Sequence, residues 1–147
     1  MNLPRLSAET VHASSVAIDG RAILITGLSG SGKSDLSLRL IDRGFILVSD
    51  DQTLVRRDED RLIASAPPPI KGKIEIRGIG IIEMETTADL PIALLVELTS
   101  DIQRLPDDSR ERPLLGINLP LVTIDAMTAS AAAKVALALE RFGLPMK

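Results

Sequence analysis

Residues 27–34, with the sequence GLSGSGKS, combine the residue types that bind a phosphate chain. Their spacing fits the pattern G-x-x-x-x-G-K-[ST], in which glycines let the backbone wind tightly and turn successive N–H groups toward an anion. Lys33 would add a positive charge near the β- and γ-phosphates, and Ser34 would offer a hydroxyl to Mg²⁺. The segment predicts a nucleoside triphosphate site, with ATP as the expected nucleotide. The predicted nucleotide-binding residues are Gly27, Leu28, Ser29, Gly30, Ser31, Gly32, Lys33 and Ser34.

The residues around this loop favour the same interpretation. A glycine-rich loop can match the pattern by chance, but such matches are rare at ordinary glycine frequencies. Here an unbroken apolar run, residues 22–26, predicts a buried strand before the loop, and residues 34–43 predict a helix after it that ends at Gly44. The loop indicates what is bound and leaves the reaction open.

Two adjacent acids, Asp50 and Asp51, follow the apolar run FILVS at residues 45–49. If this predicted strand runs parallel to the strand before the phosphate loop, both strands end at the same edge of the sheet, where α/β proteins bind ligands. The carboxylates could bind a metal ion, or accept the proton of a hydroxyl that is being phosphorylated. The other interpretation is an ordinary solvated turn after a strand.

Further candidates lie in the segment KGKIEIRGIGIIE, where Glu75 and Arg77 alternate with isoleucines. Alternation along a strand would place both charges on one face, where Glu75 could bind Mg²⁺ and Arg77 a phosphate oxygen. A solvated ion pair on a two-faced strand is the alternative. Outside this segment, His12 is the only histidine, and Arg104 lies in a polar loop, QRLPDDSRER; either could be an ordinary surface residue.

The composition limits the classes of protein that fit. The chain has 147 residues, 45% of them apolar, and a net charge of -3, which suits one globular domain and argues against general nucleic-acid binding. Cysteine is absent, which excludes disulfides and favours the cytoplasm. No apolar run is long enough to span a membrane, and the N-terminal residues do not resemble a secretory signal.

The pattern of elements predicts a strand-rich α/β fold with one helix early and one late. Asp19-Gly20 between two apolar runs predicts a hairpin. A second hairpin is expected over residues 53–65, a strand that runs into a loop over 74–85, and strands over 91–100 and 117–125. Residues 126–143 predict the late helix, with an apolar stripe formed by Met127, Ala131, Val135, Leu139 and Phe142.

Taken in order, the segments VHAS, LITGLSGSGKSDLSLRLIDRGFILVSDD, IEIRGIGIIE and QRLPDD resemble the catalytic domain of the HPr kinase/phosphorylase family. The phosphate loop alone is generic, whereas RGFILVSDD and IEIRGIGIIE are much more specific to the family. The resemblance implies a mixed, P-loop-containing β-sheet flanked by helices, like that of HPr kinase and phosphoenolpyruvate carboxykinase. It also implies an ATP- and Mg²⁺-dependent enzyme that phosphorylates a serine of the phosphocarrier protein HPr in the phosphotransferase system.

The resemblance further implies roles for single residues. Lys33 is the expected catalytic lysine, Ser34 and Glu75 are the expected metal ligands, and Asp51 is the expected base, supported by Asp50. The resemblance also implies His12 and Arg104 as active-site residues. Residues 74–83, which contain Arg77, correspond to the family's catalytic signature segment.

Departures from the family pattern lead to two more expectations. Full-length members carry a separate N-terminal domain, so residues 1–147 are expected to form a single P-loop kinase domain without it. The family has a basic Pro-Gly loop before the last helix, tied to dephosphorylation. The corresponding LVTIDAMTASAAAK has no arginine and no Pro-Gly pair, which predicts weak phosphorylase activity. The family also implies a homo-oligomer, a hexamer.

Two other functions fit the phosphate loop. One is a P-loop kinase of small molecules, although such enzymes usually build a lid and a substrate pocket within a longer chain. The other is a non-catalytic module that binds ATP and reports it to a partner.

Overall fold

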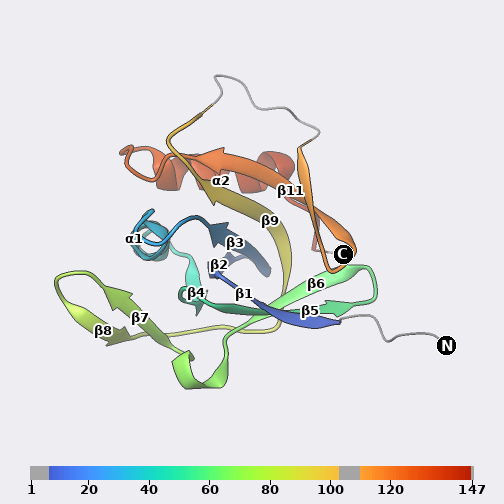
Figure 1. Ribbon diagram of the computed structural model, residues 1–147, viewed down its shortest axis with the longest axis horizontal. Coiled ribbons are helices and arrows are strands. Elements are labelled where there is room, and N and C mark those ends of the chain that lie inside the picture. The colour runs from blue at the N-terminus through green and yellow to red at the C-terminus, as the bar shows by residue number, and fades with distance from the viewer. Residues whose placement is uncertain (1–6, 103–109, 147) are drawn as a thin grey trace.

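The computed structural model describes residues 7–102 and 110–146 and has the α/β class that the sequence predicts (Figure 1). Two helices, α1 (Lys33–Asp42) and α2 (Ala131–Phe142), pack on a mixed β-sheet. The strands are β1 (Ala8–Val11), β2 (Ala13–Ile18), β3 (Arg21–Thr26), β4 (Ile46–Ser49), β5 (Thr53–Asp58), β6 (Arg61–Ser65), β7 (Lys73–Ile76), β8 (Gly80–Glu83), β9 (Leu90–Leu98), β10 (Glu111–Leu114) and β11 (Ile117–Ile124). A short 3-10 helix covers Pro68–Ile70.

The first hairpin forms as predicted. Asp19 and Gly20, with φ of 52° and 80°, make the two-residue turn between β2 and β3. Left-handed backbone at both central positions matches the twist of the flanking strands, which explains the Asp-Gly pair. The hairpin over β5 and β6 is likewise confirmed.

The main sheet has nine strands, in the order β1-β5-β6-β9-β3-β2-β4, with β10 and β11 added beside β9. Strand β9 pairs with β3 along one edge, while its other edge pairs with β6 near its start and with β11 near its end. The sheet therefore branches at β9 into one part with β6, β5 and β1 and another part with β11 and β10. Residues of both parts pack against the face of β3 that carries Leu24.

Strand direction decides where the chain can bind a ligand. Strands β9 and β11 run parallel to β3. Strand β4 has the same direction as β3, because each pairs antiparallel with β2 between them. The carboxyl ends of all four strands thus open at one edge, and the segments that follow β3, β4 and β11 meet there.

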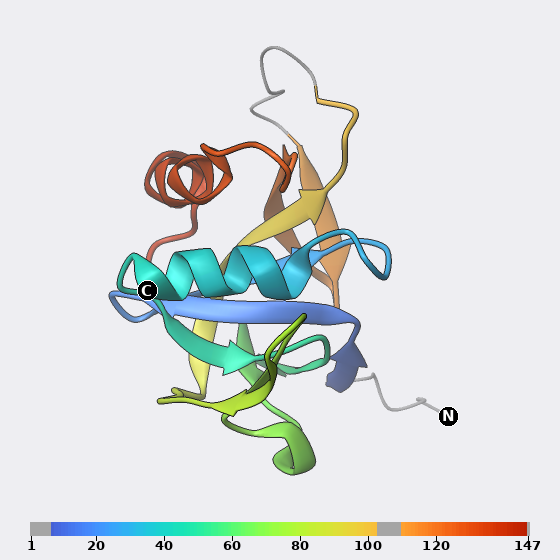
Figure 2. The same ribbon diagram turned by 90° about the vertical axis from the view of Figure 1, so that its left-hand side faces the viewer.

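Two apolar clusters occupy the two faces of the sheet. One contains Ile23, Ile25 and Val96 and is covered by Leu36 and Leu40 of α1 and by residues of α2. In Figure 2, α1 lies in front of the strands of this face. The second cluster, around Leu24 and Leu95, contains no helical residue and is enclosed by the curled sheet. Both helices flank the same face.

Helix α1 stops as predicted. Gly44 has φ of 107°, and the N–H groups of Gly44 and Phe45 donate to the carbonyls of Ile41 and Leu40 at 3.0 and 3.1 Å. This pattern ends a helix through a left-handed glycine. It turns the chain directly into β4 and so fixes where the acidic pair begins.

Three predictions about elements were wrong. The segment expected to run from a strand into a loop is a hairpin, β7–β8, because Gly78 and Gly80 take left-handed backbone and reverse the chain. Helix α2 begins at Ala131, so Met127 precedes it and is 76% exposed. Glu111 and Arg112, expected in the polar loop, instead belong to β10, which pairs with β11.

Within the described residues, no helix is both long and apolar enough to cross a membrane.

Candidate active site

The phosphate loop connects the buried strand β3 to the first turn of α1. Gly30 and Gly32 have φ of 79° and 103°, a conformation that side chains disfavour. A Cβ on Gly27 would lie 2.5 Å from Ser31 Oγ, so the loop closes tightly on itself. The loop is also braced by the Ser31 N–H, which donates to the Leu28 carbonyl at 2.9 Å. These constraints require the glycines of the predicted pattern.

Lys33 is held inside the loop. The residue is only 6% exposed, and its Nζ donates to the carbonyls of Gly27 and Leu28 at 3.0 and 3.2 Å. Burying an ammonium group costs free energy unless it is hydrogen-bonded, and the two loop carbonyls provide acceptors here. This arrangement concentrates positive charge at the start of α1.

The start of α1 fits a phosphate. The helix has no side-chain cap, so the N–H groups of its first turn remain open to an anion. The Ser31 hydroxyl is buried inside the loop and has no hydrogen-bond partner among the residues that the structure describes. A phosphate at the loop would satisfy the open N–H groups.

Asp50 connects three elements of the site. It follows β4, is 8% exposed, and its Oδ1 accepts a hydrogen bond from Ser34 Oγ at 2.6 Å. Ser14 Oγ of β2 donates to the same oxygen at 3.3 Å, and the Glu75 N–H of β7 donates to Oδ2 at 3.0 Å. The sequence predicted the acidic pair near the phosphate loop, and the direction of β4 brings it there.

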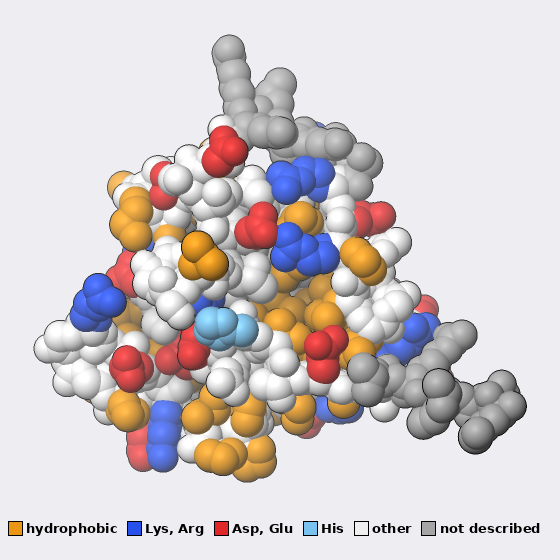
Figure 3. Space-filling model, in the orientation of Figure 1, with side chains coloured by type: hydrophobic (Ala, Val, Ile, Leu, Met, Phe, Trp, Pro, Cys, Tyr) orange, Lys and Arg blue, Asp and Glu red, His pale blue; other side chains and the backbone are white. Residues whose placement is uncertain are grey.

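Asp51 is the exposed member of the pair. Its backbone is left-handed, with φ of 66°, and its carboxylate lies 2.8 Å from His12 Nε2. The side chains of His12 and Asp51 are 53% and 57% exposed. The histidine stands at the surface with acidic side-chain atoms beside it in Figure 3. Because this carboxylate is exposed beside Asp50, a molecule that accepts a phosphoryl group could approach it from solvent.

The remaining predicted residues are less closely connected to the phosphate loop and the acidic pair. Glu75 contacts Asp50 through its N–H, while its side chain is exposed on β7. Arg77 lies in the β7–β8 turn and is exposed, so strand alternation does not place it on the face of Glu75 as expected. Arg104 lies outside the described residues.

The oxygen donors at the site suit Mg²⁺. Over residues 7–102 and 110–146, no group of three or more His, Asp or Glu side chains could hold a metal by itself. Mg²⁺ is usually held by one or two carboxylates together with substrate phosphates and waters. The Ser34 hydroxyl and the Asp50 carboxylate beside it could provide such a partial set, which the exposed Glu75 carboxylate of β7 would have to join from solvent.

Two features of the site were missed from the sequence. Ser14 lies beside Ser15 in a predicted strand, and the sequence does not distinguish the serine that contacts Asp50 and Asp51 from its neighbour. The segment that follows β11 packs on the phosphate loop, since a Cβ on Gly32 would lie 3.1 Å from that of Ala126. Arg39 of α1 holds this segment by donating to the carbonyls of Ala126 and Thr128 at 2.5 and 3.2 Å.

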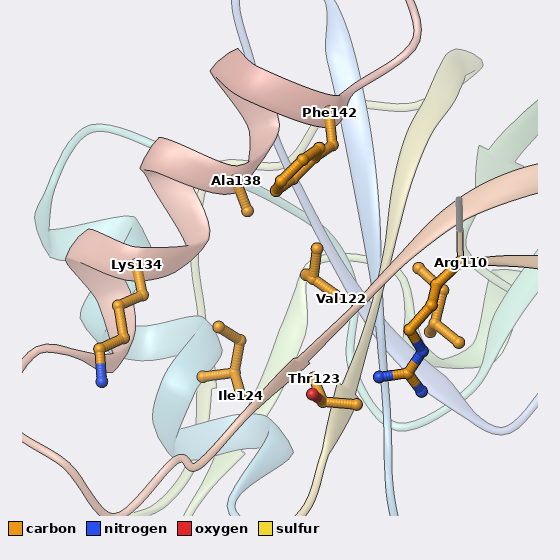
Figure 4. A pocket seen from close by; sticks show the side chains of 8 residues that line it. Arg110, Val122, Thr123, Ile124, Lys134, Ala138 and Phe142 are labelled. Atoms are coloured by element: carbon orange, nitrogen blue, oxygen red, sulfur yellow. The ribbon is translucent and has the colours of Figure 1, made fainter. Parts of the chain in front are cut away.

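A cavity of about 210 Å³ lies elsewhere, between β11 and α2 (Figure 4). Apolar side chains line most of it, with Arg110 and Lys134 at opposite sides. None of the predicted site residues lines this cavity, so the candidate site is the open edge at the phosphate loop.

The fold and this site define a P-loop domain of the α/β class, in which the sheet edge that carries the phosphate loop also carries an acidic pair. The chain belongs to the HPr Serine kinase C-terminal domain family, whose model matches residues 5–141.

Relatives and a solved structure agree with this assignment. The chain is 40% identical over 133 residues to the HPr kinase/phosphorylase of Limosilactobacillus reuteri, covering 82% of this chain and 42% of that protein. It is 42% identical over 127 residues to the protein of the same name from Geobacillus thermodenitrificans, covering 78% and 41%. The structure of the Hpr(Ser) kinase/phosphatase from Coxiella burnetii matches with a TM-score of 0.78 and 32% identity, covering 90% of this chain and 94% of that one. The chain thus spans less than half the length of these two curated relatives.

Proposed function

We propose that the chain is an ATP- and Mg²⁺-dependent kinase that phosphorylates a serine of an HPr-type phosphocarrier protein. The observation that carries this proposal is the contact between Ser34 of the phosphate loop and Asp50, with the exposed carboxylate of Asp51 next to it. The names of the related kinases support the choice of substrate. We also propose that residues 1–147 act as one catalytic domain. We further propose that the enzyme acts in the cytoplasm, because ATP is available there.

ATP would bind with its phosphates in the loop of residues 27–34. The N–H groups at the start of α1 and Lys33 would hold the phosphate oxygens. Because these groups are fixed before the nucleotide arrives, they stabilise charge in the transition state with little reorganisation.

Ser34, Asp50 and Glu75 would hold Mg²⁺ together with the phosphates. When bound, the ion would neutralise charge on the β- and γ-phosphate oxygens. Asp50 would keep Ser34 oriented toward the ion, since its Oδ1 already accepts from the Ser34 hydroxyl.

Asp51 would act as the proton acceptor. The oxygen of the substrate serine attacks the γ-phosphorus, the bond to the β-phosphate oxygen breaks, and ADP leaves while Asp51 takes the serine proton. His12, at 2.8 Å, would orient the carboxylate. Arg77 would contribute positive charge from the β7–β8 turn, and the family resemblance implies Arg104 as a further active-site arginine.

The reverse reaction is expected to be weak. The segment 125–130 packs beside the phosphate loop, at the place where the family resemblance implies a basic loop, and it contains no Arg or Lys. Serine-phosphorylated HPr with inorganic phosphate should therefore release HPr slowly. Rapid release would contradict this expectation. We further propose a homo-oligomer, a hexamer, which sedimentation would test.

The deciding experiment incubates the chain with γ-labelled ATP, Mg²⁺ and HPr, followed by mass-spectrometric mapping of the modified residue. Phosphate on a single serine of HPr supports the proposal. Label found only in a small-molecule acceptor would identify a metabolite kinase, and ATP binding without transfer to any acceptor would identify a nucleotide-sensing module.

A further inference from the structure

Ser14 lies beneath the acidic pair and contacts both of its members. The residue is fully buried on β2, 0% exposed, and two positions after His12. Its hydroxyl donates to Asp50 Oδ1 at 3.3 Å and accepts the N–H of Asp51 at 2.9 Å. One side chain therefore uses its donor on the first acid and an acceptor lone pair on the second.

The turn that Ser14 supports has an unfavourable backbone. Asp51 has φ of 66°, a left-handed conformation that sterically disfavours most residues with a side chain. Within the turn, the Gln52 N–H donates to the Asp50 carbonyl at 2.7 Å, and the Ser49 hydroxyl donates to the Gln52 carbonyl. Those two contacts are local, whereas the Ser14 contact ties the turn to the neighbouring strand.

Strand β2 is the element that relates the turn to the phosphate loop. It pairs with β3, which leads into the loop, and with β4, which leads into the turn. A hydroxyl on β2 that holds both acids therefore fixes their position relative to Lys33 and Ser34.

We propose that Ser14 is a positioning residue for the acidic pair. Its hydroxyl sets the orientation of the Asp50 carboxylate toward Ser34 and holds Asp51 in the left-handed backbone that presents its carboxylate to the acceptor. This inference rests on the proposed function, in which Asp51 takes the serine proton.

Ser15 is a matched control on the same strand. It is also 0% exposed, and its hydroxyl makes a single hydrogen bond, to the Ile23 carbonyl at 2.7 Å, on the opposite face of the strand. Ser14→Ala and Ser15→Ala therefore remove the same atom from equally buried sites, and only the first disturbs the acids.

The test measures HPr phosphorylation, thermal unfolding and amide hydrogen exchange of Asp51 for the wild type and both variants. Ser14→Ala should lower kcat about 10- to 100-fold with KM for ATP within about twofold, because misplacing a reacting group slows chemistry more than it weakens binding. The Asp51 amide should exchange faster. Ser15→Ala should keep kcat within about twofold. The Tm of this variant should nevertheless fall by about as much as the Tm of Ser14→Ala. Ser14→Thr, which keeps the hydroxyl, should restore kcat.

Other results would overturn the inference. A folded Ser14→Ala protein with wild-type kcat, an equal loss of kcat in Ser15→Ala, or a folded but inactive Ser14→Thr protein would each do so. If the wild type transfers phosphate to no acceptor, the proposed function fails, and the Asp51 amide still decides the positioning role. Unchanged protection of that amide in Ser14→Ala would then reject it.

Discussion

The hydroxyl of Ser34, at the start of α1, donates a 2.6 Å hydrogen bond to the carboxylate of Asp50, at the end of β4. These residues are 16 positions apart in the chain and belong to different elements. The contact joins the phosphate-binding half of the site to its acidic half. Changes on either side should therefore affect different steps of the proposed reaction.

Replacing the loop lysine should remove nucleotide binding and transfer together. Lys33→Met deletes the buried ammonium that the loop carbonyls hold, and phosphotransfer should fall by at least about 100-fold. Isothermal titration with Mg²⁺-ATP and the HPr assay would measure both effects. Lys134→Met on the exposed side of α2 should change neither. Full activity in the Lys33 variant would contradict the assignment of the loop.

Replacing the proposed base should slow chemistry without weakening ATP binding. Asp51→Asn keeps the shape of the side chain, and asparagine tolerates the left-handed backbone, so the fold should persist. We expect kcat to fall about 100-fold or more. The control is Asp19→Asn at the tip of the β2–β3 hairpin, another aspartate with positive φ, 52°, which should behave as wild type. Steady-state kinetics on both would show whether Asp51 takes part.

Alanine substitutions at Gly32 and Gly44 would distinguish the effect of backbone strain from the effect of a close contact. Gly32 and Gly44 have similar φ, 103° and 107°, but only Gly32 has a neighbour in the way, because an added Cβ would lie 3.1 Å from that of Ala126. Both alanine variants should lose about 1–2 kcal/mol of folding free energy. Only Gly32→Ala should also weaken ATP binding. Denaturant unfolding with and without Mg²⁺-ATP would measure this, and equal nucleotide stabilisation of the two variants would argue against it.

The metal role of Glu75 should appear as a change in Mg²⁺ requirement. Glu75→Gln should raise the Mg²⁺ concentration for half-maximal activity about tenfold. Its Tm should stay close to wild type, because the side chain is exposed and the Asp50 contact uses the backbone N–H. Glu83→Gln, exposed on the partner strand β8, is the matched control. A Mg²⁺ titration that is the same for both variants would leave Glu75 without a metal role.

The sequence by itself determined the local features of the site. The phosphate loop, its glycines, the start of α1 and the Asp19-Gly20 turn are each built from consecutive residues, so backbone preference and apolar pattern are enough to predict them. Lys33 and Ser34 follow from the same short segment.

Only the tertiary structure decided how distant residues meet. Asp50 reaches Ser34 because β2 lies between β3 and β4 and gives them one direction, and His12 reaches Asp51 across 39 positions of sequence. The β7–β8 hairpin and the packing of Ala126 on Gly32 depend equally on long-range contacts. Periodicity in a sequence reports which residues are buried and is silent on which strands are neighbours. For that reason Ser14 became visible as a partner of both acids only in the folded chain.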